Sequence, residues 1–223
     1  MKNFNKYLAE VLGTFAIVFF GTGAIIVNAH EIGLLGIALA FGLVVMAMIY
    51  AFCNISGAHF NPAVTIALTA AKKFKVTQVL PYILSQTVGA LLASLLLKVL
   101  FPASDTLGAT LPAGSEMQSF ALEFILTFFL MLVILMVAFG TREQEMFAGL
   151  VIGAVIIFEI LFAGPISGVS LNPVRSVAPA LISGHLEHLW LYIVAPIGGM
   201  ISAVFVWRLS FDKLSSPKNR QED

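Results

Sequence analysis

Two short segments, one in each half of the chain, share residues that can bind polar molecules. Ile55–Thr65 has the sequence ISGAHFNPAVT, and Ile166–Ser176 has the sequence ISGVSLNPVRS. Five of the eleven aligned positions are identical, and three more pair similar side chains. Each segment contains an Asn-Pro pair, and Asn is a preferred helix N-cap while Pro is favoured at the first helical position. Each segment therefore predicts a helix that begins beside a side-chain amide, whose N–H groups can donate hydrogen bonds to a polar molecule.

Charged residues near these segments are few, and their positions are unusual. Arg175 lies three residues after Asn172, where the dipole at a helix start disfavours a cation, so its position predicts a role beyond local stability. Glu10, Glu123 and Glu159 interrupt long apolar stretches. Because a charge in such surroundings is costly, each is a candidate for function or for a buried polar network.

Other residue types exclude several kinds of chemistry. His59 lies inside the first segment, but no second ligand stands at metal-binding spacing, so we expect no metal site. The single cysteine, Cys53, excludes an intramolecular disulfide and a cysteine-based zinc site. We find no nucleophile and base at catalytic spacing, and therefore expect neither an enzyme nor a cofactor. The formal net charge is zero, which disfavours a nucleic-acid partner.

The composition places the chain in a lipid bilayer. Of its 223 residues, 59% are hydrophobic and 11% are charged, whereas roughly 25% are charged in a soluble domain. We predict a single all-α membrane domain over residues 1–223, with glycines such as Gly42, Gly89, Gly153 and Gly199 at close helix contacts. Six apolar stretches have about the 20 residues that a transmembrane helix needs: Leu8–Val27, Ile32–Cys53, Val76–Leu97, Met117–Phe139, Met146–Pro165 and Leu189–Trp207.

Basic residues predict the orientation, because Lys and Arg are enriched in cytoplasmic loops. With the N-terminus inside, ten of the twelve fall on the cytoplasmic side: Lys2, Lys6, Lys72, Lys73, Lys75, Arg142, Arg208, Lys213, Lys218 and Arg220. Lys98 and Arg175 fall outside. We therefore expect a multi-pass protein of the cell (inner) membrane with both termini in the cytoplasm.

The similarity of the two halves extends beyond the Asn-Pro segments. Glu10 and Glu123 align, and Tyr82 and Gly89 align with Tyr192 and Gly199. We predict two internal repeats, at about residues 5–100 and 116–210, each with three spans and one insert. Because three is odd, the second repeat enters the membrane from the opposite side, which gives an inverted repeat.

Each insert predicts a re-entrant half-helix. The apolar runs Ala63–Ala71 and Val174–Ile182 are long enough for only half a crossing. Their N-termini should meet near the midplane, each with roughly half a positive charge. Irregular backbone at that depth survives only where it is buried in protein or lines a wet cavity, so Gly57–Phe60 and Gly168–Leu171 imply a pore.

Paired Asn-Pro-Ala-type motifs in inverted repeats resemble the aquaporin (major intrinsic protein) family, over roughly residues 5–210. The resemblance implies a passive water channel that excludes ions and protons, built as a homotetramer. It also implies that the pore carries Asn61, Pro62 and Ala63 from the first motif and Asn172, Pro173 and Val174 from the second. The outer selectivity filter would be Phe41, Ile160, Val169 and Arg175, and Glu10 and Glu123 would brace the inserts.

The predicted filter departs from that of strict water channels. Ile160 stands where they usually have His, which removes a polar wall and widens the filter. Glycerol facilitators usually have Trp at position 41 and Asp after the arginine, whereas this chain has Phe41 and Ser176. The combination is similar to that of archaeal-type and nodulin-like members, and the resemblance implies a prokaryotic member of the family. Val174 replaces the Ala of the motif and adds bulk where the half-helices should meet.

Three functions remain open at the level of sequence. The first is a water channel, and the second is a facilitator of glycerol, urea or undissociated metalloid acids through the same pore. The third is a proton- or ion-coupled carrier that uses Glu10, Glu123 and Glu159. The sequence favours a channel, because the paired glutamates lie on long spans rather than in the inserts.

Overall fold

The structure, a computed structural model, describes residues 2–28 and 33–211. Six of its helices are long and apolar enough to cross a membrane. They are α1 (Lys2–Asn28), α2 (Gly33–Ser56), α4 (Val79–Leu100, preceded by the 3₁₀ turn η1, Val76–Gln78), α5 (Glu116–Ala138), α7 (Ala148–Ser167) and α9 (Leu189–Ser210). The prediction of six spans is confirmed, although Ile32, the expected start of the second span, lies outside the described residues.

Three short helices complete the architecture. The predicted half-helices are α3 (Pro62–Ala70) and α8 (Pro173–Ser183), each about half as long as a spanning helix. The third, α6 (Arg142–Met146), was not expected from the sequence. It is held by a capping box, in which Thr141 and Gln144 exchange side-chain-to-backbone hydrogen bonds.

The α7 helix continues two residues beyond its predicted end. Pro165 lies inside its last turn, where we expected the helix to stop. A proline removes only its own N–H, and Gly168 then ends the helix in the left-handed conformation, with its N–H donated to the carbonyl of Gly164. The actual end therefore depends on this glycine cap.

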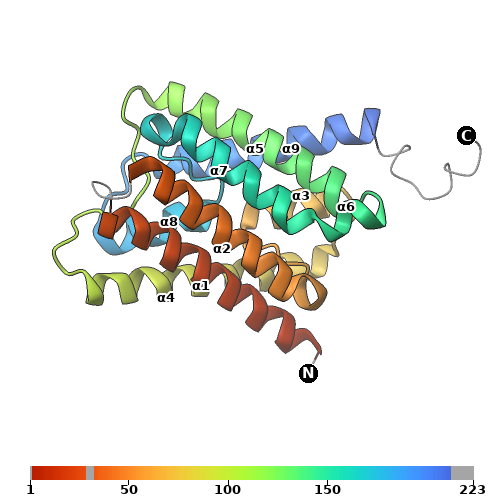
Figure 1. The fold of residues 1–223 in the computed structure, drawn as a ribbon, viewed down its shortest axis with the longest axis horizontal. Coiled ribbons are helices and arrows are strands. Elements are labelled where there is room, and N and C mark those ends of the chain that lie inside the picture. Colours follow the sequence, from red (N-terminus) through yellow and green to blue (C-terminus); the bar gives the residue numbers. More distant parts are fainter. Residues whose placement is uncertain (1, 29–32, 212–223) are drawn as a thin grey trace, which may run out of the picture.

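The helices form an inverted repeat. In the first half, α1 packs against α4 and α2, and in the second half α5 packs in the same way against α9 and α7. Between the halves, α2 contacts α7 and α3 contacts α8. Figure 1 shows the start of α1, α6 and the end of α9 at one end of the bundle, which we call the termini end. Residues 101–115, which connect the halves, lie at the opposite end, the loop end.

Glycines permit the closest helix contacts, as predicted. A Cβ atom at Gly89 would lie 2.3 Å from the carbonyl oxygen of Val11, and one at Gly199 would lie 2.2 Å from that of Phe124. At the crossing of α2 and α7, a Cβ at Gly42 would lie 2.6 Å from the carbonyl oxygen of Gly153. No side chain fits at such distances, so these glycines set how tightly the bundle closes around its centre.

The outer surface of the bundle is apolar. Large hydrophobic side chains stand out from the long helices, among them Phe20 on α1, Phe129 on α5, Phe162 on α7 and Phe205 on α9, each more than half exposed. In water such a surface would aggregate, whereas it matches the hydrocarbon of a bilayer. The polar residues Glu10, Thr14, Gln86, Glu123 and Thr127 are fully buried inside.

Candidate functional site: a pore between two half-helices

Both Asn-Pro pairs begin a half-helix in the same way. Asn61 and Asn172 are extended N-cap residues, followed by Pro62 and Pro173 at the first helical positions. The Asn61 Oδ1 atom accepts a hydrogen bond from the backbone N–H of Ala63 at 2.9 Å, and Asn172 Oδ1 accepts one from that of Val174 at 3.2 Å. Each amide oxygen is therefore used within its own repeat, which leaves the amide nitrogen for other contacts.

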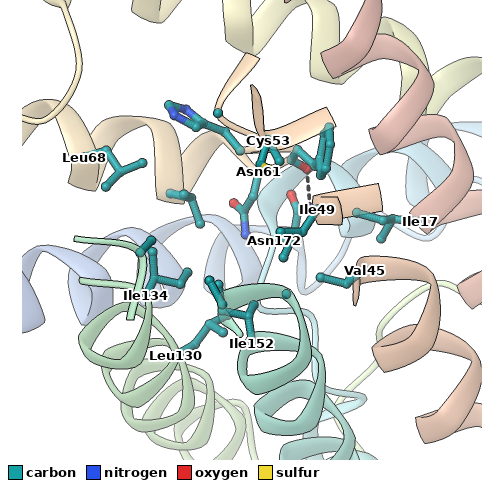
Figure 2. Close-up of a pocket in the computed structure, with 18 of the residues that line it drawn as sticks. Ile17, Val45, Ile49, Cys53, Asn61, Leu68, Leu130, Ile134, Ile152 and Asn172 are labelled. Carbon is teal, nitrogen blue, oxygen red and sulfur yellow. Dashed lines mark hydrogen bonds between the residues drawn. The ribbon is translucent and has the colours of Figure 1, made fainter. Parts of the chain in front are cut away.

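The amide nitrogens join the two repeats. Asn61 Nδ2 donates to the carbonyl oxygen of Leu171 at 2.7 Å, and Asn172 Nδ2 donates to that of Phe60 at 2.9 Å. We expected both amides to offer donors to a passing molecule, and in the structure each gives one N–H to this exchange. An amide has two such hydrogens, so one donor per asparagine remains. Figure 2 shows the two side chains close together at the centre of a cavity with aliphatic walls.

The backbone before each half-helix is strained in the same pattern. Ala58, Phe60, Val169 and Leu171 have φ values of 53°, 51°, 42° and 57°, in the left-handed region that residues with a Cβ atom avoid. Each costs on the order of 1 kcal/mol or more. Such a conformation persists only if other groups hold it. In this structure one buried carboxylate contacts each loop.

Glu10 and Glu123 accept hydrogen bonds from these loops. Glu10 accepts from the Ser56 hydroxyl at 2.6 Å and from the backbone N–H groups of His59 and Phe60 at 3.0 and 2.7 Å. Its second oxygen also accepts from Gln86 Nε2 at 2.8 Å. The carboxylate thus satisfies loop donors that would otherwise be buried without a partner, as a bracing role requires.

Glu123 makes the corresponding contacts in the second repeat. It accepts from the Ser167 hydroxyl at 3.0 Å and from the N–H groups of Ser170 and Leu171 at 2.8 and 3.0 Å. Tyrosines add a matching contact, because Tyr82 and Tyr192 donate to the carbonyl oxygens of the serines that end α2 and α7. Neither Glu10 nor Glu123 lines the cavity, so both carboxylates face the loops.

The cavity between the half-helices has a volume of about 560 Å³. It is lined by Lys6, Lys73 and Glu145 at the termini end and by Arg175 toward the loop end. Between them the wall is mainly aliphatic, with Ile17, Val45, Leu68, Ile134 and Ile152 from α1, α2, α3, α5 and α7 (Figure 2). Polar side chains also line the cavity, among them His59, Asn61, Ser170 and Asn172. Of the charged side chains that the described residues place on its wall, Glu145 of α6 is the one carboxylate.

All four predicted filter residues line this cavity. Phe41, Ile160, Val169 and Arg175 come from α2, α7, the loop before α8, and α8 itself. Arg175 is 1% exposed, and its Cζ atom lies 5.1 Å from the centroid of the Phe41 ring. This is a cation–π distance, so the ring stabilises the buried guanidinium.

The other motif residues lie behind the wall. Pro62, Ala63, Pro173 and Val174 are buried and are not among the residues that line the cavity. The Val174 side chain belongs to a small apolar cluster with Val18 of α1 and Ala90 and Ala93 of α4. Its extra bulk relative to alanine is therefore absorbed between helices rather than in the lumen.

Sequence reasoning missed the residues that contact the filter from the connecting segment. Arg175 Nη1 donates to the carbonyl oxygen of Gly108 at 2.8 Å. Gly108 and Leu107 have φ values of 70° and 53°, and Leu107 is fully buried, so residues 101–115 fold into the loop end. The only signal in the sequence was the run of small and apolar residues there, which is weak.

Glu159 lies apart from both the cavity and the loops. It is 1% exposed, and neither of its carboxylate oxygens has a hydrogen-bond partner within residues 2–28 and 33–211. The sequence predicts no specific role for this residue. In the structure it precedes Ile160 in α7 and does not line the cavity.

Comparison with known proteins decides the family. Residues 1–207 match the family profile described as Major intrinsic protein. The chain belongs to the major intrinsic protein family. It is therefore a multi-pass membrane channel and not an enzyme.

Plant members of this family are similar to the chain over most of its length. It is 45% identical over 208 residues to "Aquaporin NIP1-1" of Zea mays, which covers 92% of this chain and 74% of the relative. It is 40% identical over 208 residues to "Nodulin-26" of Glycine max, and the match covers 92% of this chain and 77% of the relative. The nodulin-like character expected from the filter is consistent with these relatives.

A solved structure has the same fold. The X-ray structure of the aquaglyceroporin from Plasmodium falciparum matches with a TM-score of 0.84, covering 95% of this chain and 98% of that one. The sequences are only 23% identical, so this likeness concerns the fold. It confirms the prediction of six spans and two re-entrant half-helices in an inverted repeat.

Proposed function

We propose that this member of the major intrinsic protein family is a passive channel for water that excludes ions and protons. One observation carries the proposal: the 560 Å³ cavity is lined by the two asparagines that begin the half-helices, and much of the rest of its wall is aliphatic. Water can pass such a wall without being held, because aliphatic groups make no hydrogen bonds. The remaining N–H of Asn61 and of Asn172 supplies a donor at the centre.

The same geometry opposes cation and proton passage. The N-termini of α3 and α8 meet at the centre, and their dipoles add a positive potential there. A water molecule whose oxygen accepts from the asparagines points its own hydrogens away from the centre, which interrupts a chain of proton transfer. Arg175 adds a full positive charge near the loop end, as expected for pores of this type.

Small neutral solutes are a second candidate permeant class. Ile160 adds an aliphatic group to the wall of the cavity that Arg175 also lines, and such a wall accepts the carbon skeleton of glycerol or the bulk of an undissociated acid. The named relatives include plant aquaporins of the nodulin-like group, and the structural match is named an aquaglyceroporin. Glycerol, urea and undissociated metalloid acids are therefore the solutes to test beside water.

A proton- or ion-coupled carrier fits this structure less well. Such a carrier needs a titrating group in the path, but Glu10, Glu123 and Glu159 are all absent from the cavity wall. Glu10 and Glu123 accept three or more hydrogen bonds each, which commits them to the loops. Dependence of flux on a pH or Na⁺ gradient would favour the carrier instead.

We also propose an orientation and an assembly. Lys6, Lys73 and Arg208 lie at the termini end, where Arg208 donates to the carbonyl oxygen of Ala70 at the end of α3. By the positive-inside rule this end faces the cytoplasm of a cell (inner) membrane. Lys213, Lys218 and Arg220 lie outside the described residues. A homotetramer is the assembly that the family resemblance implies, with one pore per subunit.

Osmotic experiments with purified protein in liposomes test the proposal. We expect a hyperosmotic step with an impermeant sugar to shrink channel-containing vesicles faster than empty ones, without added proton conductance across a pH gradient. A glycerol gradient, measured side by side, reports the second permeant class. Shrinkage at the rate of empty vesicles would contradict the water channel.

Substitution of Ile160 tests the wide filter. Ile160→His places a polar ring that reaches further into the cavity that Arg175 also lines, so we expect the ratio of glycerol to water permeability to fall by roughly tenfold, as for a small steric change in a pocket. Ile156→His, one helical turn away on the same wall, is the matched control and should change that ratio less. If the parent protein passes no glycerol at all, the wide-filter argument is wrong.

A further inference from the structure

Each re-entrant segment holds a polar pair at equivalent positions of the repeat. In the first segment, His59 Nδ1 lies 3.1 Å from the Thr65 hydroxyl. In the second, the hydroxyls of Ser170 and Ser176 lie 2.5 Å apart. Both pairs join the loop before the half-helix to its first turn. Because the pairs are equivalent, the groups that contact them from outside the segment can be compared directly.

In the first repeat, this contact comes from a membrane helix. Gln86 of α4 donates from Nε2 to the Thr65 hydroxyl at 3.0 Å and to Glu10 at 2.8 Å. The repeat register, in which Tyr82 aligns with Tyr192, places Pro196 at the position of Gln86. Proline has no side-chain donor, so α9 cannot make the equivalent contact in the second repeat.

In the second repeat, the contact comes instead from the connecting segment. The hydroxyls of Thr110 and Ser176 lie 2.6 Å apart, and both side chains are buried. Ser170 continues the chain by donating to the carbonyl oxygen of Asn172 at 2.9 Å. A line of hydroxyls therefore runs from residues 101–115 through the first turn of α8 to the central asparagine.

The same segment also holds the filter arginine. Gly108, two residues before Thr110, provides the carbonyl oxygen that accepts from Arg175 Nη1. The part of the chain that the structure describes places no carboxylate within salt-bridge distance of Arg175. The direction of the guanidinium therefore depends on a neutral carbonyl, and that carbonyl is anchored to α8 through the Thr110–Ser176 hydrogen bond.

We propose that Thr110 and Ser176 are positioning residues for Arg175, and that the segment between the repeats thereby controls permeation through the filter. This inference rests on the proposed channel function. Neither residue lines the cavity, so neither touches the permeant directly. When their hydrogen bond is absent, Gly108 is no longer fixed, and the guanidinium spends time across the lumen. Flux then falls, and it falls more for glycerol than for the smaller water molecule.

The test compares permeability per reconstituted channel. Thr110→Val keeps the side-chain shape and removes the hydroxyl, and we expect water permeability to fall roughly fivefold, the effect of one ordinary hydrogen bond. Ser176→Ala should give at least the same loss, because it also removes the contact with Ser170, and the double variant should lose no more than Ser176→Ala alone. Thr110→Ser retains the hydroxyl and should restore the parental rate. Thr87→Val, which removes a hydroxyl bonded only locally within α4, is the matched control.

A further background separates positioning from general stability. According to the proposal, Thr110 acts on permeation through Arg175. In an Arg175→Ala channel, adding Thr110→Val should therefore leave permeability unchanged. An additive loss in that background, or parental permeability of both single variants, would overturn the proposal. A parent protein that passes neither water nor glycerol would instead contradict the proposed channel function. Failure of the positioning proposal and failure of the channel proposal are therefore distinguishable. Thermal unfolding in detergent checks that each variant is folded.

Discussion

The two re-entrant segments are alike in the contacts that hold them and different in the side chains that they present to the cavity. Both have an asparagine cap, an exchange of amide hydrogen bonds, strained loops and a buried glutamate that accepts from them. At the third position after the asparagine, however, the first segment has Val64 and the second has Arg175, and both line the cavity. The duplication thus preserves the contacts that hold the half-helices, while the residue type at this lining position has diverged.

The segments also differ in what anchors them from outside. Gln86, on a membrane helix, contacts Thr65, whereas Thr110, on a segment at the loop end, contacts Ser176. A helix inside the bundle is held by packing along its whole length, while a connecting segment is held by few contacts. This difference predicts that the filter end of the pore is the more sensitive to sequence changes between the repeats.

Removal of the buried glutamates should have the largest effect and should separate the two segments. Glu10→Leu leaves four donors without their acceptor (Ser56, His59, Phe60 and Gln86), and Glu123→Leu leaves three (Ser167, Ser170 and Leu171). Each buried unsatisfied donor costs about 1–3 kcal/mol, so both variants should lose at least about 3 kcal/mol of unfolding free energy. Denaturation in mixed micelles measures the loss, which should be greater for Glu10.

The isosteric variants Glu10→Gln and Glu123→Gln are the controls for that comparison. Each retains one carbonyl acceptor and should therefore lose less than the leucine variant at the same position. A leucine variant as stable as its glutamine control would contradict the bracing role at that position. An equal loss at both glutamates would show that the contact from Gln86 adds nothing to the first segment.

The sequence predicted the symmetric part of this arrangement well. The Asn-Pro pairs locate the half-helices because capping is local, whereas Phe41, Ile160 and Val169 were expected from the offsets that the family resemblance implies, and all three line the cavity. Gly108 and Thr110 could not be found in this way, since their contacts depend on how an irregular segment folds back over the bundle. The donation of each asparagine amide to the opposite loop was also missed, because it requires the two repeats to be docked.

Glycine substitutions should have the next largest effect, and an equal one in both repeats. A Cβ at Gly89 would lie 2.3 Å from the carbonyl oxygen of Val11, and one at Gly199 would lie 2.2 Å from that of Phe124. Gly89→Ala and Gly199→Ala should each separate a pair of helices and cost about 1–3 kcal/mol of unfolding free energy. Gly23→Ala is the control, because its nearest neighbour is a flexible Leu97 methyl at 3.4 Å. Unequal losses at the two sites would show that the helix pairs α1–α4 and α5–α9 are not energetically equivalent.

The smallest expected effect concerns the exchange of amide hydrogen bonds at the centre. Asn61→Ser and Asn172→Ser keep an N-cap of similar strength but are too short to reach the carbonyl oxygens of Leu171 and Phe60. Each should therefore lose only the cross-repeat hydrogen bond, about 1 kcal/mol of unfolding free energy, and the two losses should match. Thr141→Ser, at the exposed N-cap of α6, is a control for the effect of replacing an N-cap residue by serine. A clearly larger loss at Asn172 would mean that the second repeat depends more on this link, because its outside anchor is a connecting segment rather than a helix.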